Sequence, residues 1–144
     1  MRIVGIGNEV VECLRIARMI ERHGEKFIHR VYTAAEIAYC NSRKHATQHF
    51  AGRWAAKEAV LRAVGVRSRQ GFDWRNIEIR RDRETGRDKV RARGPARDVI
   101  EQAGIGEIWV TIAHCRSVAT AHAVALRARR RKPPEPPPEP TGEA

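Results

Sequence analysis

The distribution of proline limits how much of this chain can fold. Six of the seven prolines lie after residue 126, in a segment that reads RARRRKPPEPPPEPTGEA. Proline removes a backbone donor, and no apolar periodicity remains in this segment, so we expect residues 127–144 to form an extended, disordered tail. The 144-residue chain is therefore expected to contain one folded domain, residues 1–126.

The positive charge favours an anionic partner. The chain has 28 Lys and Arg against 17 Asp and Glu, a net charge of +11. The tail contributes only +2 of this, so most of the charge belongs to the expected domain. Nucleic acid, anionic lipid, a phosphorylated cofactor and an acidic protein all remain possible partners.

Other features indicate the compartment. No apolar run approaches the roughly 20 residues that a membrane helix needs, and the N-terminus lacks the apolar stretch of a signal peptide. The three cysteines, Cys13, Cys40 and Cys115, are odd in number and scattered, which argues against a disulfide framework or a structural zinc site. We therefore expect a cytoplasmic protein.

Hydrophobic periodicity predicts an α+β fold in which an N-terminal strand and helices pack on a mostly antiparallel sheet. The expected helices span residues 10–23, a short segment opened by a capping box at Thr33 and Glu36, about 45–64 ended by Gly65, and a short segment begun by Gly94 and Pro95. The expected strands span residues 2–6, 77–79, 89–93, 108–112 and 118–126.

Glu9 is a first candidate ligand. It follows Gly5 and Gly7 at the expected end of the first strand, where the glycines allow a tight turn or a close approach to a ligand. A carboxylate there is well placed for a metal. A surface glutamate that caps the following helix is the simpler interpretation of these residues alone.

Glu58 is a second candidate on the long expected helix. It shares a face with Ala51, Ala55 and Arg62, and the small alanines leave room for a ligand or another chain segment. The alternative is a surface ion pair between Glu58 and Arg62 at i,i+4 spacing, which the spacing alone slightly favours.

Basic residues form two further groups. One face of the expected first helix carries three arginines around a methionine, which suits an acidic, partly apolar helix: Arg15, Arg18, Met19 and Arg22. A second group suits phosphate, because arginine matches phosphate oxygens: Arg43, Lys44 and Arg53. His114 ends a strand, a place where histidine is usually structural. For the two basic groups the alternative is an ordinary solvated surface.

Taken in order, five segments resemble the bacterial holo-acyl-carrier-protein synthases, the small trimeric class of 4′-phosphopantetheinyl transferases. They are IVGIGNEVVE from residue 3, FIHRVYTAAEIAYC at 27–40, FAGRWAAKEAVLRAVG at 50–65, GFDWRNIEI at 71–79, and the strand ending in His114. The ordered set is specific, and it covers most of residues 3–126.

The resemblance implies transfer of phosphopantetheine from coenzyme A to a serine of apo-acyl carrier protein. It implies Mg²⁺ held by Glu9 and Glu58, with a water bound to Glu58 or to the metal acting as the general base. It implies that the coenzyme is held by Arg43, Lys44, Arg53, Arg62, Gly65 and His114. Carrier protein would meet Arg15, Arg18, Met19 and Arg22. The resemblance also implies a homotrimer with sites between subunits.

Several positions depart from the family pattern. The family commonly has Asp where Glu9 stands, Lys at Arg62, Gly-Thr-Gly where the chain has Gly65, Val66 and Arg67, and Ser at Ala113. Arg62 stays protonated, so it stabilises a pyrophosphate but is a poor proton donor. These departures motivate an alternative, a catalytically weak member that binds carrier protein or coenzyme A. A basic nucleic-acid-binding protein is less favoured, because no helix-turn-helix, zinc-finger or stacking-aromatic motif is present.

Overall fold

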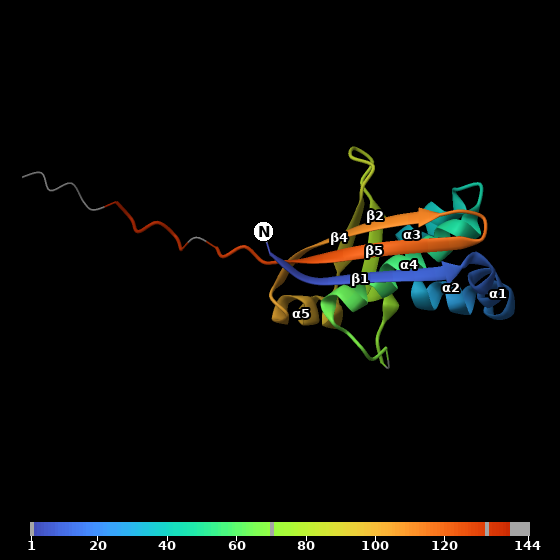
Figure 1. The fold of residues 1–144 in the computed structure, drawn as a ribbon, viewed down its shortest axis with the longest axis horizontal. Helices are drawn as coiled ribbons and strands as arrows, with labels where there is room; N and C mark the ends of the chain where they lie inside the picture. Colours follow the sequence, from blue (N-terminus) through green and yellow to red (C-terminus); the bar gives the residue numbers. More distant parts are fainter. Residues whose placement is uncertain (1, 70, 132, 139–144) are drawn as a thin grey trace, which may run out of the picture.

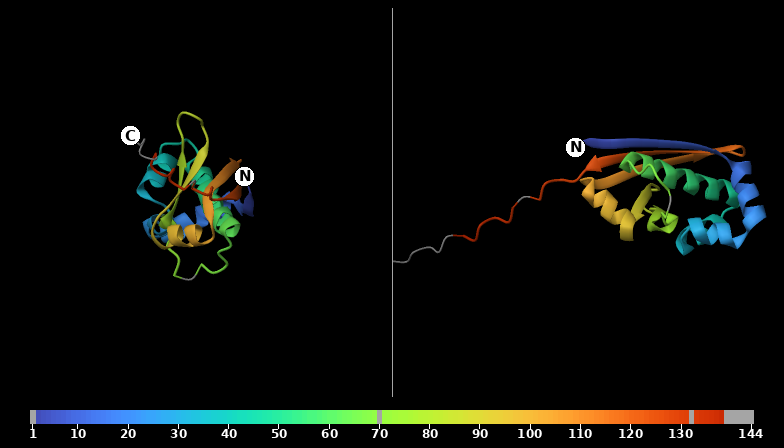
Figure 2. Two further views of the ribbon diagram at one scale, coloured as in Figure 1. Left: turned by 90° about the vertical axis from the view of Figure 1, so that its left-hand side faces the viewer. Right: turned by 90° about the horizontal axis from the view of Figure 1, so that it is seen from below.

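Five antiparallel strands form one sheet in the order β1-β5-β4-β3-β2, and the helices lie against one of its faces (Figures 1 and 2). This computed structural model describes residues 2–69, 71–131 and 133–138. The strands are β1 Ile3–Glu12, β2 Ile77–Arg81, β3 Asp88–Ala92, β4 Ile105–His114 and β5 Val118–Arg127. The helices are α1 Cys13–His23, α2 Glu25–Val31, α3 Ala34–Asn41, α4 Ala46–Val64, the 3₁₀ turn η1 Trp74–Asn76, and α5 Gly94–Gln102. The α+β prediction is confirmed.

Small residues allow the central helix α4 to lie unusually close to the sheet. β5 presents Ala119, Ala121, Ala123 and Ala125 to the core, all fully buried. On the neighbouring strand, a Cβ at Gly7 would overlap the carbonyl oxygen of Ala59 on α4. The glycine therefore serves close helix–strand packing, and not the tight turn or close approach to a ligand that the sequence suggested.

The first strand is longer than the sequence predicts. The predicted strand ended at residue 6 and the predicted helix began at residue 10, but β1 continues to Glu12 and α1 begins at Cys13. Val10, expected on the apolar face of the helix, is 63% exposed on β1. The reason is long-range pairing, because β1 pairs with β5 as far as Glu12, opposite Val118. Periodicity within one segment does not carry that information.

The helix boundaries otherwise follow local chemistry. The predicted capping box is present: the Thr33 side chain accepts from the Glu36 amide, and Glu36 accepts from the Thr33 amide. α4 ends at Gly65, whose φ of 92° lies in the left-handed region. The sequence did not predict α2, a seven-residue helix that follows Gly24.

A buried ion pair ties α4 to the elements beside it. Lys57 and Glu36 are both fully buried and lie 2.6 Å apart. The Lys57 ammonium also donates to the carbonyl oxygens of Val31 at 2.7 Å and Trp74 at 3.1 Å, while Glu36 accepts from the Ile79 amide at 3.0 Å. Lys57 is therefore a structural residue, although its neighbour Glu58 is a site candidate.

In Figure 2 the helices leave the other face of the sheet open. Ile6, Val124 and Trp109 lie side by side across β1, β5 and β4, and both Ile6 and Trp109 are exposed. Among the residues described above, no helix is both long and apolar enough to cross a membrane.

Candidate active site

Glu9 points toward α4 because side chains alternate along β1. Gly7 and Val11 are buried on the same side, whereas Asn8 and Val10 are exposed. The Glu9 carboxylate lies 2.8 Å from the Arg62 guanidinium, which also donates to the Asn8 carbonyl oxygen at 2.6 Å. Arg62 therefore reaches across to the strand. The alternative of a Glu58–Arg62 pair along the helix is wrong.

Glu58 has a different arginine as its partner. Its Oε2 lies 2.9 Å from the Arg69 guanidinium, which also donates to the Val66 carbonyl oxygen. Arg69 belongs to the loop that follows Gly65, and sequence reasoning missed it. The available signal was the arginine-rich loop that replaces Gly-Thr-Gly, but nothing in the spacing indicated which arginine turns back to α4.

Glu9 and Glu58 lie in one region of the β1–α4 seam. Arg62 follows Glu58 by one helical turn and contacts Glu9, so the two carboxylates flank the same stretch of α4. Their side chains are 16% and 12% exposed, accessible yet sheltered. Within the described ranges, no group of three or more His, Cys, Asp or Glu residues is arranged to hold a metal. Two carboxylates suit Mg²⁺, which binds few protein ligands and completes its shell with water and phosphate.

A separate cluster gathers cations on aromatic rings at the other side of α4. The guanidinium groups of Arg53 and Arg43 lie 3.9 Å and 4.7 Å from the centre of the Tyr39 ring. Arg53 is buried, and its Nε has no hydrogen-bond partner among the described residues. His49 packs edge-on against both Tyr39 and His114, with ring centres 5.7 Å and 4.6 Å apart. We call Tyr39, Arg43, His49, Arg53 and His114 the basic cluster.

The electrostatics of the basic cluster favour neutral imidazoles and a bound anion. Burial, and then electrostatic repulsion from His114 and from the Arg53 guanidinium, lower the pKa of His49 to about 4. Burial and Arg53 also lower the pKa of His114, whose Nδ1 lies 3.0 Å from the Gln48 side-chain oxygen. Asp88 faces Arg53 from β3, and burial raises the pKa of its carboxyl group. The cluster therefore has excess positive charge held close together.

The structure unites some of the predicted coenzyme-binding residues and separates others. Arg43, Arg53 and His114 belong to the basic cluster, which includes the unpredicted Tyr39 and His49. Lys44 is exposed beside Arg43, and Gly65 caps α4 three residues after Arg62. We call Glu9 and Glu58 the acidic pair. Arg53 and Glu58 are five residues apart on one helix, which turns their side chains about 140° away from each other. The acidic pair and the basic cluster therefore lie on different sides of α4.

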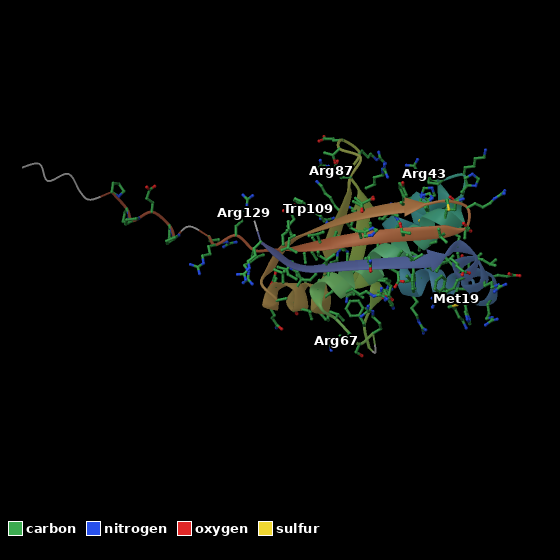
Figure 3. The ribbon with its side chains drawn as sticks, viewed as in Figure 1. Met19, Arg43, Arg67, Arg87, Trp109 and Arg129 are labelled. Atoms are coloured by element: carbon green, nitrogen blue, oxygen red, sulfur yellow. The ribbon has the colours of Figure 1, made fainter. Side chains whose placement is uncertain are left out.

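A groove on α1 gathers the four predicted docking residues. It has a volume of about 470 Å³ and is lined by Val10, Val11, Glu12, Arg15, Arg18, Met19 and Arg22. Met19 is half-buried against the core, whereas the sequence suggested an exposed side chain. Arg15 lies 5.3 Å from the centre of the Trp54 ring. Figure 3 labels Met19 and Arg43, which lie on opposite sides of the strands β1, β5 and β4 in that view.

A larger cavity, of about 1180 Å³, lies where β3 and β4 diverge beside α5. The two strands pair only at Asp88–Val110 and Lys89–Trp109, and the gap beyond is lined in part by Ile100 and Ile108. It contains none of the predicted site residues, so its size alone does not make it the site.

Comparison with known proteins agrees with this arrangement. The profile of the 4′-phosphopantetheinyl transferase superfamily matches residues 5–113. The chain belongs to this superfamily. The match covers both candidate carboxylates and most of the basic cluster, and ends one residue before His114.

The proteins similar to this chain include holo-acyl-carrier-protein synthases of comparable length. That of Rhodopirellula baltica is 45% identical over 124 residues, which cover 86% of this chain and 98% of the relative. The synthase of Geobacter sp. strain M21 is 34% identical, over 87% of this chain and 99% of the relative. The crystal structure of the Neisseria meningitidis synthase matches with a TM-score of 0.78 at 31% identity, over 88% of this chain and all of the other. An ACPS–CoA complex from Chronobacterium ammoniagenes matches with a TM-score of 0.76 at 27% identity, over 90% and 100%.

Proposed function

We propose that this protein transfers the 4′-phosphopantetheine group of coenzyme A to a serine of apo-acyl carrier protein. The products are holo-acyl carrier protein and adenosine 3′,5′-bisphosphate. The observation that carries the proposal is the pair Glu9 and Glu58 on the β1–α4 seam, with Arg62 between them. The family membership and the synthases similar over nearly their whole length support it.

The reaction needs a nucleophile, a base and a way to neutralise the leaving group. The serine oxygen attacks the phosphorus that carries the pantetheine arm, and the bond from that phosphorus to the bridging oxygen of the diphosphate breaks. The serine proton passes to Glu58, directly or through a water. Arg62 stays charged, so it stabilises the negative charge that develops on the leaving phosphate without giving up a proton.

Glu9 and Glu58 are the residues that we propose to hold Mg²⁺. When bound there, the ion would neutralise the diphosphate and stabilise the leaving phosphate. Glu9 is one methylene longer than the Asp common in the family. Its carboxylate already reaches Arg62 on α4, which supports its ability to reach a ligand at the seam.

We propose that the basic cluster binds coenzyme A and that the α1 groove binds the carrier protein. We propose that Arg43, Lys44, Arg53 and His114 hold the nucleotide and its 3′-phosphate. Buried Arg53 is fixed by Tyr39, so little side-chain freedom is lost when a phosphate binds. We propose that Arg15, Arg18 and Arg22 pair with acidic residues of the carrier protein, and that Met19 supplies the apolar contact of the groove.

A homotrimer would bring together two half-sites, the acidic pair and the basic cluster. The acidic pair and the basic cluster lie on different sides of α4, so a neighbouring copy must supply one of them to a complete site. The uncovered sheet face offers an apolar surface for that contact: Ile6, Val10 and Trp109 are 66%, 63% and 49% exposed (Trp109 is labelled in Figure 3).

The molar mass in solution, measured by light scattering after size-exclusion chromatography, tests the trimer. We expect a mass near three chains for the wild type and a smaller mass for Ile6→Lys, with transfer activity lost in parallel. Val99→Lys is the matched control, because Val99 is exposed by 40% on α5, away from this face. A monomeric wild type that retains full activity would contradict the trimer.

We further propose that residues 1–126 form the transferase domain and that residues 127–144 form a tail outside it. β5 runs one residue past this boundary, to Arg127, and residues 128–131 and 133–138 form no helix or strand, which supports a division close to it. Residues 132 and 139–144 lie outside the described residues. The free Cys13, Cys40 and Cys115 fit a reducing compartment, and we expect the protein in the cytoplasm.

Mass spectrometry tests the function directly. Apo-acyl carrier protein incubated with coenzyme A, Mg²⁺ and the wild type should gain the mass of phosphopantetheine on one serine, as it does with an active homologue run alongside. If the homologue modifies the carrier protein and this protein does not, the chain is a binding member of the family and the transferase proposal fails.

A further inference from the structure

Each candidate metal ligand is already paired with an arginine. Glu9 lies 2.8 Å from Arg62, and Glu58 lies 2.9 Å from Arg69. The two pairs differ in origin: Arg62 is on α4 itself, whereas Arg69 comes from the loop between α4 and η1. The loop arginine has no role in the mechanism above, so its position needs an explanation.

Arg69 is well held at the site. Its side chain is 25% exposed, and the same guanidinium that contacts Glu58 also donates to the Val66 carbonyl oxygen. Its Nε is buried without a hydrogen-bond partner among the described residues. A guanidinium with an unused buried donor is an incomplete arrangement, because such a donor has lost its contact with water.

Arg69 and a divalent cation compete for the Glu58 carboxylate, because both are positively charged. A cation bound to Glu58 brings two positive charges beside the guanidinium, and like charges at a sheltered site repel strongly. Cation binding at Glu58 must therefore weaken the Arg69 contact. A diphosphate that arrives with the cation offers oxygens that suit the planar arginine fork.

We propose that Arg69 is a further coenzyme-binding residue with two alternating partners: the Glu58 carboxylate before a divalent cation binds, and a phosphate oxygen of coenzyme A afterwards. This rests on the proposed function of Glu58. It also gives the Glu58–Arg69 contact a role: the arginine balances the carboxylate when the coenzyme is absent.

The first test measures Mn²⁺ binding to the full-length protein by electron paramagnetic resonance, with no coenzyme present. Arg69→Gln should bind Mn²⁺ about threefold or more tightly than the matched control Arg67→Gln, since the competing ion pair is gone. Arg67 is exposed on the same loop (Figure 3) and takes part in no ion pair among the described residues, so its variant removes the same charge without breaking a contact. Equal Mn²⁺ affinities for the two variants would overturn the proposal.

The second test measures coenzyme A binding by calorimetry in Mg²⁺, without carrier protein. Arg69→Gln should weaken this binding about threefold or more relative to Arg67→Gln, and Arg69→Lys should recover part of the loss. Opposite signs for the two ligands distinguish the proposal from a structural role. If Arg69 merely shaped the loop, Arg69→Gln would weaken both ligands, and that result overturns the proposal.

A third variant separates this inference from the function on which it rests. Glu58→Gln should weaken Mn²⁺ binding strongly. If it does so and Arg69→Gln gives no gain, only the role of Arg69 fails. If Glu58→Gln leaves Mn²⁺ affinity unchanged, the metal role of Glu58 fails and the inference fails with it, whereas transfer of phosphopantetheine to carrier protein remains a separate measurement.

Discussion

Both sides of α4 hold charged side chains close to the protein core, but the charges are stabilised differently on each side. At the acidic pair each carboxylate has an arginine partner, Glu9 with Arg62 and Glu58 with Arg69, so charge is balanced one to one. In the basic cluster, Arg43 and Arg53 lie on the Tyr39 ring, and no ion pair among the described residues involves either of them.

The difference indicates what each half-site is prepared to accept. The ion pairs of the acidic pair must rearrange before a cation binds to the carboxylates. Cation binding is therefore coupled to the transfer reaction that we propose. An aromatic platform holds cations without neutralising them, so an excess of positive charge stays available for an anion. We therefore expect substitutions at the acidic pair to affect the rate, and substitutions in the basic cluster to affect coenzyme affinity.

The largest effect is expected from Glu58→Gln. Loss of the carboxylate removes both a metal ligand and a proton acceptor, so kcat/KM should fall about 100-fold or more, mainly through kcat. Carrier-protein modification followed by mass spectrometry measures it. Glu25→Gln, an exposed change on α2, is the control and should leave the rate unchanged. Retention of full activity in Glu58→Gln would break the comparison at its acidic side.

The next effect is expected from Arg53→Met in the basic cluster. Met keeps much of the buried length of Arg53 but removes the charge, so KM for coenzyme A should rise about tenfold or more, with kcat less affected. Dephospho-coenzyme A, which lacks the 3′-phosphate, gives the control. With that substrate the wild type and the variant should differ little. A penalty of equal size for both substrates would show that Arg53 serves the fold and not the phosphate.

A smaller effect is expected from Arg18→Glu on α1. Reversing one charge of the groove should raise KM for carrier protein about fivefold, because an exposed charge contributes modestly. KM for coenzyme A should stay the same. Arg30→Glu on α2 makes the same charge change away from the groove and is the control. Equal effects of Arg18→Glu on both substrates would contradict α1 as the docking face.

Local sequence chemistry predicted much of this fold. The capping box at Thr33 and the left-handed Gly65 are set by near neighbours, and both are observed. β2 is a strand as predicted, but Ile77, Glu78 and Ile79 are all buried, so its sides do not alternate between core and solvent. The extension of β1 to Glu12 was not predictable in this way, because it depends on pairing with a strand more than 100 residues later. That extension also changed the role of Gly7: the glycine permits close approach of α4, and not the expected tight turn or contact with a ligand.

The candidate site follows the same division. The predicted residues Glu9, Arg62 and Glu58 do lie on one seam, since strand alternation and helix periodicity place them there. Their pairing was not predictable, because i,i+4 spacing favoured Glu58–Arg62 and the folded chain pairs Arg62 with Glu9. Arg69 was missed because an irregular loop has no period from which its side-chain direction follows.

The smallest effect concerns His49 and the pH dependence of stability. Burial, aided by electrostatic repulsion from His114 and from the Arg53 guanidinium, lowers the pKa of His49 to about 4, against about 6.5 for a free imidazole. The unfolded chain therefore binds more protons between these values, so the stability that depends on neutral His49 is fully present above pH 6.5 and is lost as pH falls toward 4. Asp88 has the opposite sign, because burial raises the pKa of its carboxyl group, but it is common to the wild type and the variant.

His49→Phe isolates this contribution, since Phe keeps the aromatic contact with Tyr39 and His114 but does not titrate. The free energy of unfolding, measured by urea denaturation from pH 4 to pH 8, should fall less steeply with decreasing pH in the variant than in the wild type. Above pH 6.5 the difference between the two proteins should be constant. A difference that stays constant down to pH 4 would mean that the fold does not hold His49 neutral, which would contradict the sheltered, positively charged surroundings that we assign to the basic cluster.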